Sequence, residues 1–417
     1  MIAPVSVASL RGRRLRIAVV AWDMGHNGVI RAYYAAEMLS RKHDVELVGV
    51  NFRSFGTEIW EPIRDGRLRM RAFPGRALPQ FVDDAERFTR DMRPDLVYVS
   101  RARLPSLLIG MLIKHRSGVP VIVDIDDLEF SFYGSGDGTG LALDALAALR
   151  DERGFRVSHG ELWTRACHEL IADADAVTVS NEVLQGIYGG TVLLQVRDER
   201  TFNRALYDRG TLRADLGFSP RDRVIMFIGT PKRHKGVTRI VDALTQLADP
   251  AYKLCIVGSI PDDDLRAQLH ASPFVTVVGS RPVSEIPPLV TVGDLVCVPQ
   301  DPDSAIARHQ TPGKLTEALA MAVPVLAESV APLAPFIAAG LVTPIGETPL
   351  ARQIAALFAD PDAMVATARR GRQFFLRRMS YAAGCRTFDD VVAGLDLDRR
   401  ELPARWLKAY RLARDGG

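Results

Sequence analysis

Cysteine is scarce in this chain, and its few copies are far apart. Cys167, Cys255, Cys297 and Cys385 form no C-x-x-C pair, and none lies beside a set of metal ligands. This spacing argues against disulfide bonds and against a cysteine metal site. It favours buried free thiols in a reducing compartment.

Long apolar runs are missing as well. No run approaches the roughly 20 residues that a membrane-spanning helix needs. The short apolar start is followed by basic residues at 11–14 and by no long apolar core, which is not the pattern of a secretory signal. We therefore expect a cytoplasmic protein.

Charge of one sign is not in large excess. The net charge is only +3, so nothing in the charge balance requires a nucleic-acid partner, and we expect none. Basic residues cluster locally, at 11–16 and 232–235, where they can meet phosphate groups.

What the chain does contain is a regular alternation of apolar runs and amphipathic stretches. This alternation is typical of parallel sheets covered by helices, and 417 residues exceed the size at which one core usually suffices. We predict an α/β protein with two Rossmann-like halves joined near residues 194–203. The expected strands are 15–22, 45–50, 96–100, 119–124 and 176–180, then 224–229, 253–258, 275–279, 295–299 and 323–327.

A helix start near residue 313 combines two features of a nucleotide site. Residues 310–327 read as a polar Pro-Gly turn, a small-residue helix and an apolar strand. The unpaired N–H groups near Thr311 and Gly313 favour an anion such as a diphosphate. Glu317, inside the first turns, can accept two hydrogen bonds from a ribose diol. An ordinary turn, helix and strand of an α/β domain is the alternative.

This stretch resembles the nucleotide-sugar site of family-4 retaining glycosyltransferases (glycosyl transferases group 1). That family carries a Glu, seven residues, and then Glu-Ala-Met-Ala-x-Gly-x-Pro-Val. His309 stands where the family has its first Glu, and Leu319 and Ala322 replace the Met and the Gly. The second half of the motif is matched at Glu317, Ala318, Ala320, Pro324 and Val325.

The resemblance extends from about residue 16 to 389 and implies a GT-B fold, with two parallel sheets facing a central cleft. It further implies that His309 contacts the donor sugar and that the helix start binds the rest of the donor. The donor-binding residues expected there are Thr311, Gly313, Lys314, Leu315 and Glu317.

Loops that leave the carboxyl ends of the strands are where such folds bind ligands. The loop over residues 22–31 is similar to the family's glycine loop near the transferred sugar and the acceptor. We assign Gly28 to the donor and Asn27, which replaces the usual first Gly, to the acceptor side. A plain strand-to-helix turn would also use glycines, and no G-x-G-x-x-G is present.

Carboxylates crowd the loop after the strand at 119–124. Alignment with the family places Asp126 on a His that reaches the donor sugar, and a carboxylate there would favour positive charge at an anomeric carbon. Asp127 is assigned to the acceptor side. A metal site that includes Glu129, or helix capping by either aspartate, are the alternatives.

Residues 230–236 resemble the family's Gly-Arg-x-x-x-x-Lys-Gly, in which Arg and Lys hold the donor diphosphate. Lys235 and Gly236 match, whereas Thr230 replaces the Arg, so Lys232 or Arg233 would supply the missing charge. A solvated basic turn is the alternative.

Two further segments are open to two interpretations each. The glycine-rich stretch at 134–140 is either a lid or a surface linker. The tail at 406–414 mixes aromatic and basic residues at helical spacing. It would either touch a membrane surface or pack back on the N-terminal domain.

We therefore predict a metal-independent, cofactor-free glycosyltransferase. It would move a sugar from a nucleoside diphosphate sugar to an acceptor hydroxyl with retention of configuration. Expected domains are 1–195 for the acceptor, 196–389 for the donor and a helical tail at 390–417. Asp126, His309 and Lys235 are the expected catalytic residues, and Arg233 is expected to join the donor site. The acceptor is a saccharide, a lipid-linked glycan or a small metabolite. A nucleotide-sugar 2-epimerase and a catalytically silent relative remain alternatives.

Overall fold

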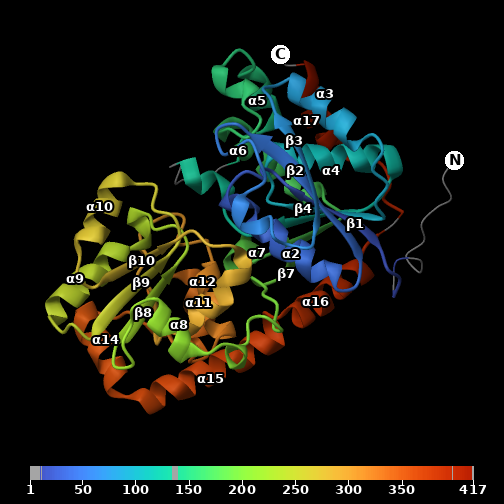
Figure 1. Ribbon diagram of the computed structural model, residues 1–417. Helices are drawn as coiled ribbons and strands as arrows, with labels where there is room; N and C mark the ends of the chain where they lie inside the picture. Colours follow the sequence, from blue (N-terminus) through green and yellow to red (C-terminus); the bar gives the residue numbers. More distant parts are fainter. Residues whose placement is uncertain (1–9, 11, 134–139, 397, 416–417) are drawn as a thin grey trace. The chain divides into compact units, whose positions relative to one another are not determined.

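The computed structural model describes residues 10, 12–133, 140–396 and 398–415. The chain divides into two compact units, Met1–Leu194 with Gly384–Gly417 (unit 1) and Gln195–Ala383 (unit 2). Each unit is built around one parallel sheet flanked by helices (Figure 1). The predicted α/β class with two Rossmann-like domains is therefore confirmed. Of the glycine-rich stretch, residues 134–139 lie outside the described part.

The sheet of unit 1 has seven parallel strands in the order β3-β2-β1-β4-β5-β6-β7. Ile17 of the central strand pairs with Val45 on one side and Leu96 on the other, which sets the register of the three strands. The strands are β1 Arg16–Ala21, β2 Asp44–Phe52, β3 Arg69–Gly75, β4 Leu96–Ser100, β5 Val121–Ile125, β6 Ala176–Val179 and β7 Thr191–Val192.

Alternate side chains of each strand point to opposite faces of this sheet, and both faces are buried. Val97 and Val99 join one large apolar core, whereas Tyr98 between them contacts Phe388 from the opposite layer. The helices are α2 Ile30–Ser40, α3 Gln80–Thr89, α4 Leu104–Ser117, α5 Leu143–Ala148, α6 Glu161–Leu170, α7 Glu182–Tyr188, α16 Tyr381–Ala393 and α17 Ala404–Asp415.

The C-terminal helix α17 packs on unit 1. Trp406 is fully buried and donates a hydrogen bond from its indole N–H to the carbonyl of Leu170 at 2.8 Å. Ala409 and Leu412 join the same apolar core. The apolar side chains of this tail, for which a membrane contact was one interpretation, are therefore covered by protein. Among the described helices, none is long and apolar enough to cross a membrane.

Unit 2 repeats the arrangement with six parallel strands in the order β10-β9-β8-β11-β12-β13. Its strands are β8 Arg223–Ile228, β9 Tyr252–Val257, β10 Val275–Gly279, β11 Leu295–Val298, β12 Val325–Ala327 and β13 Thr343–Pro344. Its helices are α8 Arg209–Asp215, α9 Val237–Leu247, α10 Asp263–Ala271, α11 Ile286–Val292, α12 Gly313–Ala320, α13 Ala334–Ala338, α14 Leu350–Ala359 and α15 Pro361–Arg378.

All ten expected strands are present, with ends shifted by at most two residues. Three strands were not predicted. β7 and β13 have only two residues each, and β3 is an edge strand whose apolar residues alternate with Arg69 and Arg71. The four cysteines are buried free thiols, as the sequence predicts.

Candidate active site

Unit 2 gathers basic side chains where β8 ends. The loop after β8 leads through the 3-10 turn Arg233–Lys235 into α9. Lys235 donates from Nζ to the carbonyl oxygen of Thr230 at 2.9 Å. Its charge also acts on Lys314, which lies in the first turn of α12. Lys235 and Lys314 are about 80 residues apart in sequence, and the fold of unit 2 brings these two basic side chains to the same site.

Lys314 is almost completely buried, and its Nζ lies 3.8 Å from the centre of the Phe227 ring. Burial, together with the nearby charge of Lys235, holds the pKa of Lys314 well below its usual range. A bound anion would reverse this shift, because negative charge favours the protonated amine. The site is therefore suited to an anionic ligand.

Glu317 lies on α12 and forms a buried ion pair with Arg197. Arg197 Nη2 and Nε donate to Glu317 Oε1 at 2.6 and 3.3 Å, and the two side chains are 4% and 9% exposed. No described residue is hydrogen-bonded to the second oxygen, Oε2. Glu317 is thus held in place through one oxygen, and the other can accept hydrogen bonds from a ligand.

The N-terminus of α12 has no side-chain cap, since Pro312 occupies the N-cap position. The hydroxyl Oγ1 of Thr311, one residue earlier, is buried and has no hydrogen-bond partner among the described residues. An unsatisfied buried hydroxyl costs about 1–3 kcal/mol, so a ligand that bonded it would recover that energy. This observation points to a polar ligand at the helix start.

Two predicted residues have other contacts in unit 2. His309 donates from Nδ1 to the carbonyl oxygen of Ala305 at 2.8 Å, which fixes the hydrogen on that nitrogen. Arg233 is largely exposed and its nearest acidic partner is Asp262, at 3.4 Å. The charge of Lys235 acts on Lys314, whereas Arg233 pairs with Asp262.

Gly236 shows why the loop needs a glycine after Lys235. Its φ angle is +70°, and a Cβ atom there would lie 1.8 Å from the carbonyl oxygen of Pro299. We expect Gly236→Ala to destabilise unit 2 by at least about 2 kcal/mol, through strain and backbone displacement. Calorimetric unfolding would measure this loss. Gly346→Ala, which meets no atom within 4 Å, is the control; equal effects of the two changes would contradict the prediction.

In unit 1, the loop after β5 forms a buried cluster of charges around Arg101. Its Nη2 lies 2.9 Å from Asp126 Oδ2 and 2.8 Å from Asp127 Oδ2, and its Nη1 lies 3.2 Å from Glu129 Oε1. Arg103 adds a second guanidinium, 2.5 Å from Glu129 Oε2. Three carboxylates therefore share two arginines.

Asp126 shows the effect of burial within this cluster. Burial raises the pKa of Asp126 to about 7, the charge of Arg101 opposes the rise and the charge of Asp127 adds to it. Its Oδ1 is buried without a hydrogen-bond partner among the described residues. Asp126 is therefore balanced between its acid and its carboxylate form near neutral pH.

The oxygens of Asp126, Asp127 and Glu129 lie within 4.8 Å of one another, which is the grouping that a metal ion needs. The positive charge in this group is supplied by Arg101 and Arg103. The geometry supports an ion-pair network here, and we assign no metal.

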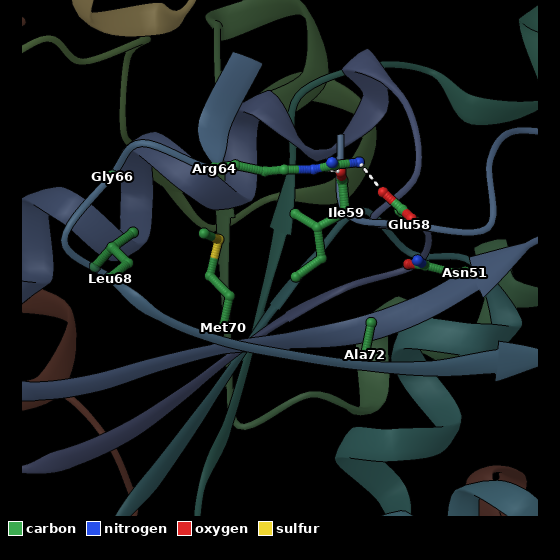
Figure 2. Close-up of a pocket in the computed structure, with 8 residues that line it drawn as sticks. All are labelled: Asn51, Glu58, Ile59, Arg64, Gly66, Leu68, Met70 and Ala72. Atoms are coloured by element: carbon green, nitrogen blue, oxygen red, sulfur yellow. Dashed lines mark hydrogen bonds and ion pairs between the residues drawn. The ribbon is translucent and has the colours of Figure 1, made fainter. Parts of the chain in front are cut away.

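A pocket of about 520 Å³ lies beside β3 in unit 1. Figure 2 shows the residues that line it. Arg64 pairs with Glu58 at 2.8 Å on its rim. The amide oxygen Oδ1 of Asn51 is buried and has no hydrogen-bond partner among the described residues. This pocket was not predicted from the sequence, because β3 was not predicted. The remaining lining residues are Ile59, Gly66, Leu68, Met70 and Ala72.

Two family models match the chain. The model described as Glycosyl transferases group 1 matches residues 222–360, and the model described as Glycosyl transferase 4-like domain matches residues 28–189. Each match lies within one unit, and together they cover more than half of the chain. The chain belongs to the group 1 glycosyltransferases. No curated protein sequence matches it significantly.

Solved structures share the GT-B fold of this glycosyltransferase at low sequence identity. HepE from Anabaena, solved with UDP and glucose, has a TM-score of 0.68 and 16% identity over 92% of this chain and 100% of HepE. Sucrose-phosphate synthase from Thermosynechococcus elongatus has a TM-score of 0.63 and 16% identity over 91% and 98%. A candidate UDP-N-acetylglucosamine 2-epimerase from Listeria monocytogenes gives 0.53 and 13% over 86% and 91%.

The glycosyltransferase thus carries the predicted residues in two separate groups. Lys235, Lys314 and Glu317 come together in unit 2, whereas Asp126 and Asp127 lie in the arginine cluster of unit 1. Gly313 adjoins Arg197, and Leu315 is fully buried in α12. Gly28 and the exposed Asn27 form part of the 3-10 turn Asn27–Val29 in unit 1.

Several important side chains of this glycosyltransferase were missed from the sequence. Arg101 follows the predicted strand at 96–100 directly, so a search of every strand end would have found it. Asp23 and His26 stand three residues apart after the first strand, and this spacing would also have indicated that the two side chains can interact. Arg197 lies outside every motif, and only the fold brings it to Glu317.

Proposed function

We propose that this enzyme transfers a sugar from a nucleoside diphosphate sugar to an acceptor hydroxyl with retention of configuration. Unit 2 binds the donor, and unit 1 supplies the acceptor side. The observation that carries the proposal is the group of Lys235, Lys314 and Glu317 beside an uncapped helix start. Cations and free N–H groups suit the diphosphate, and a held carboxylate suits the ribose.

The chemistry follows from where charge develops. As the bond between the sugar and the diphosphate breaks, negative charge grows on the leaving phosphate, and Lys235 with the amides of α12 stabilises it. An oxygen of the departing phosphate takes the proton of the acceptor hydroxyl, and the acceptor oxygen forms the new bond to the anomeric carbon on the same face of the sugar. Asp126, in its carboxylate form, favours the positive charge that develops at the anomeric carbon.

His309 is proposed to read the donor sugar through Nε2, since its Nδ1 is committed to Ala305. Uridine nucleotides are the first donors to test, because HepE was solved with UDP and with UDP-glucose. The mechanism that we propose requires no metal, because lysines and helix amides neutralise the phosphate.

The test is a thermal-shift and calorimetric screen against UDP, GDP, ADP, TDP and their sugars. We expect one nucleotide to stabilise the wild type, and we expect Lys235→Ala and Glu317→Ala to weaken its binding at least about tenfold, as loss of a charged hydrogen bond predicts. Arg221→Ala, which removes an exposed cation of unit 2 outside this loop, is the matched control. Absence of binding by any nucleotide would overturn the donor site and favour a silent relative. Turnover of the sugar without an acceptor would favour an epimerase.

A further inference from the structure

A buried aspartate holds a histidine at the carboxyl end of β1. Asp23 is fully buried, and its Oδ1 accepts hydrogen bonds from the backbone N–H of Gly25 at 2.8 Å and from His26 Nδ1 at 2.7 Å. Its Oδ2 accepts from the backbone N–H of Phe52 at 2.9 Å. Because a carboxylate only accepts, the imidazole hydrogen lies on Nδ1, and Nε2 is left as an acceptor.

The other edge of this imidazole lies beside Gly28. No described residue is hydrogen-bonded to His26 Nε2, and the side chain is 25% exposed. A Cβ atom at Gly28 would lie only 2.7 Å from Nε2, so the glycine leaves the space that the ring edge needs. The loop thus presents one oriented hydrogen-bond acceptor where α/β proteins bind ligands.

Aromatic rings surround this acceptor. Phe55 stacks on His26 with ring centres 4.5 Å apart, and it is 39% exposed. Trp22 meets the edge of His26 at 5.0 Å, and its indole Nε1 is buried without a hydrogen-bond partner among the described residues. An apolar ring surface beside a polar acceptor suits a ligand that has hydroxyl groups on its edge and C–H groups on its face. Sugars have this chemistry.

We propose that His26 and Phe55 bind a saccharide acceptor, with His26 Nε2 accepting a hydrogen bond from an acceptor hydroxyl. Asp23 is a positioning residue, since it acts by fixing the tautomer and direction of the imidazole. This inference rests on the proposed function, and it specifies the substrate class on the acceptor side of the reaction.

The experiment uses the full-length enzyme, the donor found in the nucleotide screen and a panel of p-nitrophenyl glycosides of the common hexoses. We expect the wild type to glycosylate at least one member. His26→Phe keeps the aromatic stacking and loses the acceptor atom, so its KM for that glycoside should rise about tenfold or more. His26→Gln places an oxygen near the position of Nε2 and should recover much of this loss.

Asp23→Asn should raise the same KM and leave kcat nearly unchanged, because Asp23 only positions the imidazole. Nucleotide affinity should be unchanged in all variants, because the nucleotide binds unit 2. An unchanged acceptor KM in a folded His26→Phe variant would overturn the inference, as would a nucleotide-binding wild type that glycosylates no member of the panel. A wild type that binds no nucleotide would instead overturn the proposed function.

Discussion

Arg101→Met is expected to destabilise unit 1 by about 3–5 kcal/mol at pH 8, the cost of removing one partner from a buried charge network. Arg101 forms ion pairs with both Asp126 and Asp127, and both carboxylates are almost completely buried. Without the guanidinium, each carboxylate must either remain charged in an apolar setting or take up a proton. Either outcome costs free energy of folding.

The loss should depend on pH in a definite direction. The pKa of Asp126 is already raised to about 7 by burial, and Arg101 is what opposes this rise. Without Arg101, the pKa of Asp126 in the folded variant should rise further above its value in the unfolded chain. The folded variant therefore keeps this proton over a wider pH range. A raised folded-state pKa lowers stability as pH increases through it, so the deficit is largest above pH 7 and shrinks toward pH 5.

Tryptophan fluorescence during urea unfolding can measure this effect. Trp22, Trp60, Trp163 and Trp406 are the four tryptophans of the chain, and all belong to unit 1. Arg71→Met is the matched control, because Arg71 forms an exposed pair with Glu46 at 2.7 Å. Such surface pairs contribute about 0–1 kcal/mol. A loss in Arg101→Met that equals the control, or that does not change with pH, would contradict the prediction.

Arg101 also shows what kind of information the sequence carries. Its backbone has a φ angle of +66°, which is rare for a residue other than glycine and costs of order 1 kcal/mol. No local preference of arginine predicts that angle. The conformation is held by the ion pairs of its side chain and by the hydrogen bond of its N–H to the carbonyl of Asp124 at 2.8 Å, and those partners come from a different strand end.

The fold, in contrast, was largely predictable. Strands of a parallel sheet are buried on both faces, so segments such as Leu295–Val298 and Val325–Ala327 are continuous apolar runs. β3 escaped prediction because an edge strand is half exposed and alternates apolar residues with arginines. The missed pocket follows from the missed strand, since Met70 and Ala72 of β3 line it.

The site was predictable where its residues share one loop or one helix turn. Lys314 and Glu317 are three residues apart on α12, so their common face follows from helix geometry. Arg197 is 120 residues from Glu317 in sequence, and no spacing rule connects them. Its position follows from the parallel bridge between Arg197 and Ser380, a contact set by tertiary structure alone.

That pair gives the second large prediction. Arg197→Met leaves Glu317 buried without its cation, so unit 2 should lose about 3–5 kcal/mol of stability. Glu317 would also lose the two hydrogen bonds that Arg197 donates to Oε1. These bonds hold the carboxylate so that Oε2 can accept from the proposed ribose. We therefore expect the affinity for the nucleoside diphosphate to fall at least about tenfold.

A double variant separates the two effects. Replacing a buried ion pair by apolar side chains of similar size is often neutral, so Arg197→Met with Glu317→Met should recover most of the lost stability. It should not recover nucleotide binding, since the ribose partner is gone. Calorimetric unfolding and nucleotide titration of the single and double variants measure both quantities. Wild-type nucleotide affinity in a stable double variant would show that Glu317 serves the fold of unit 2 and not the donor.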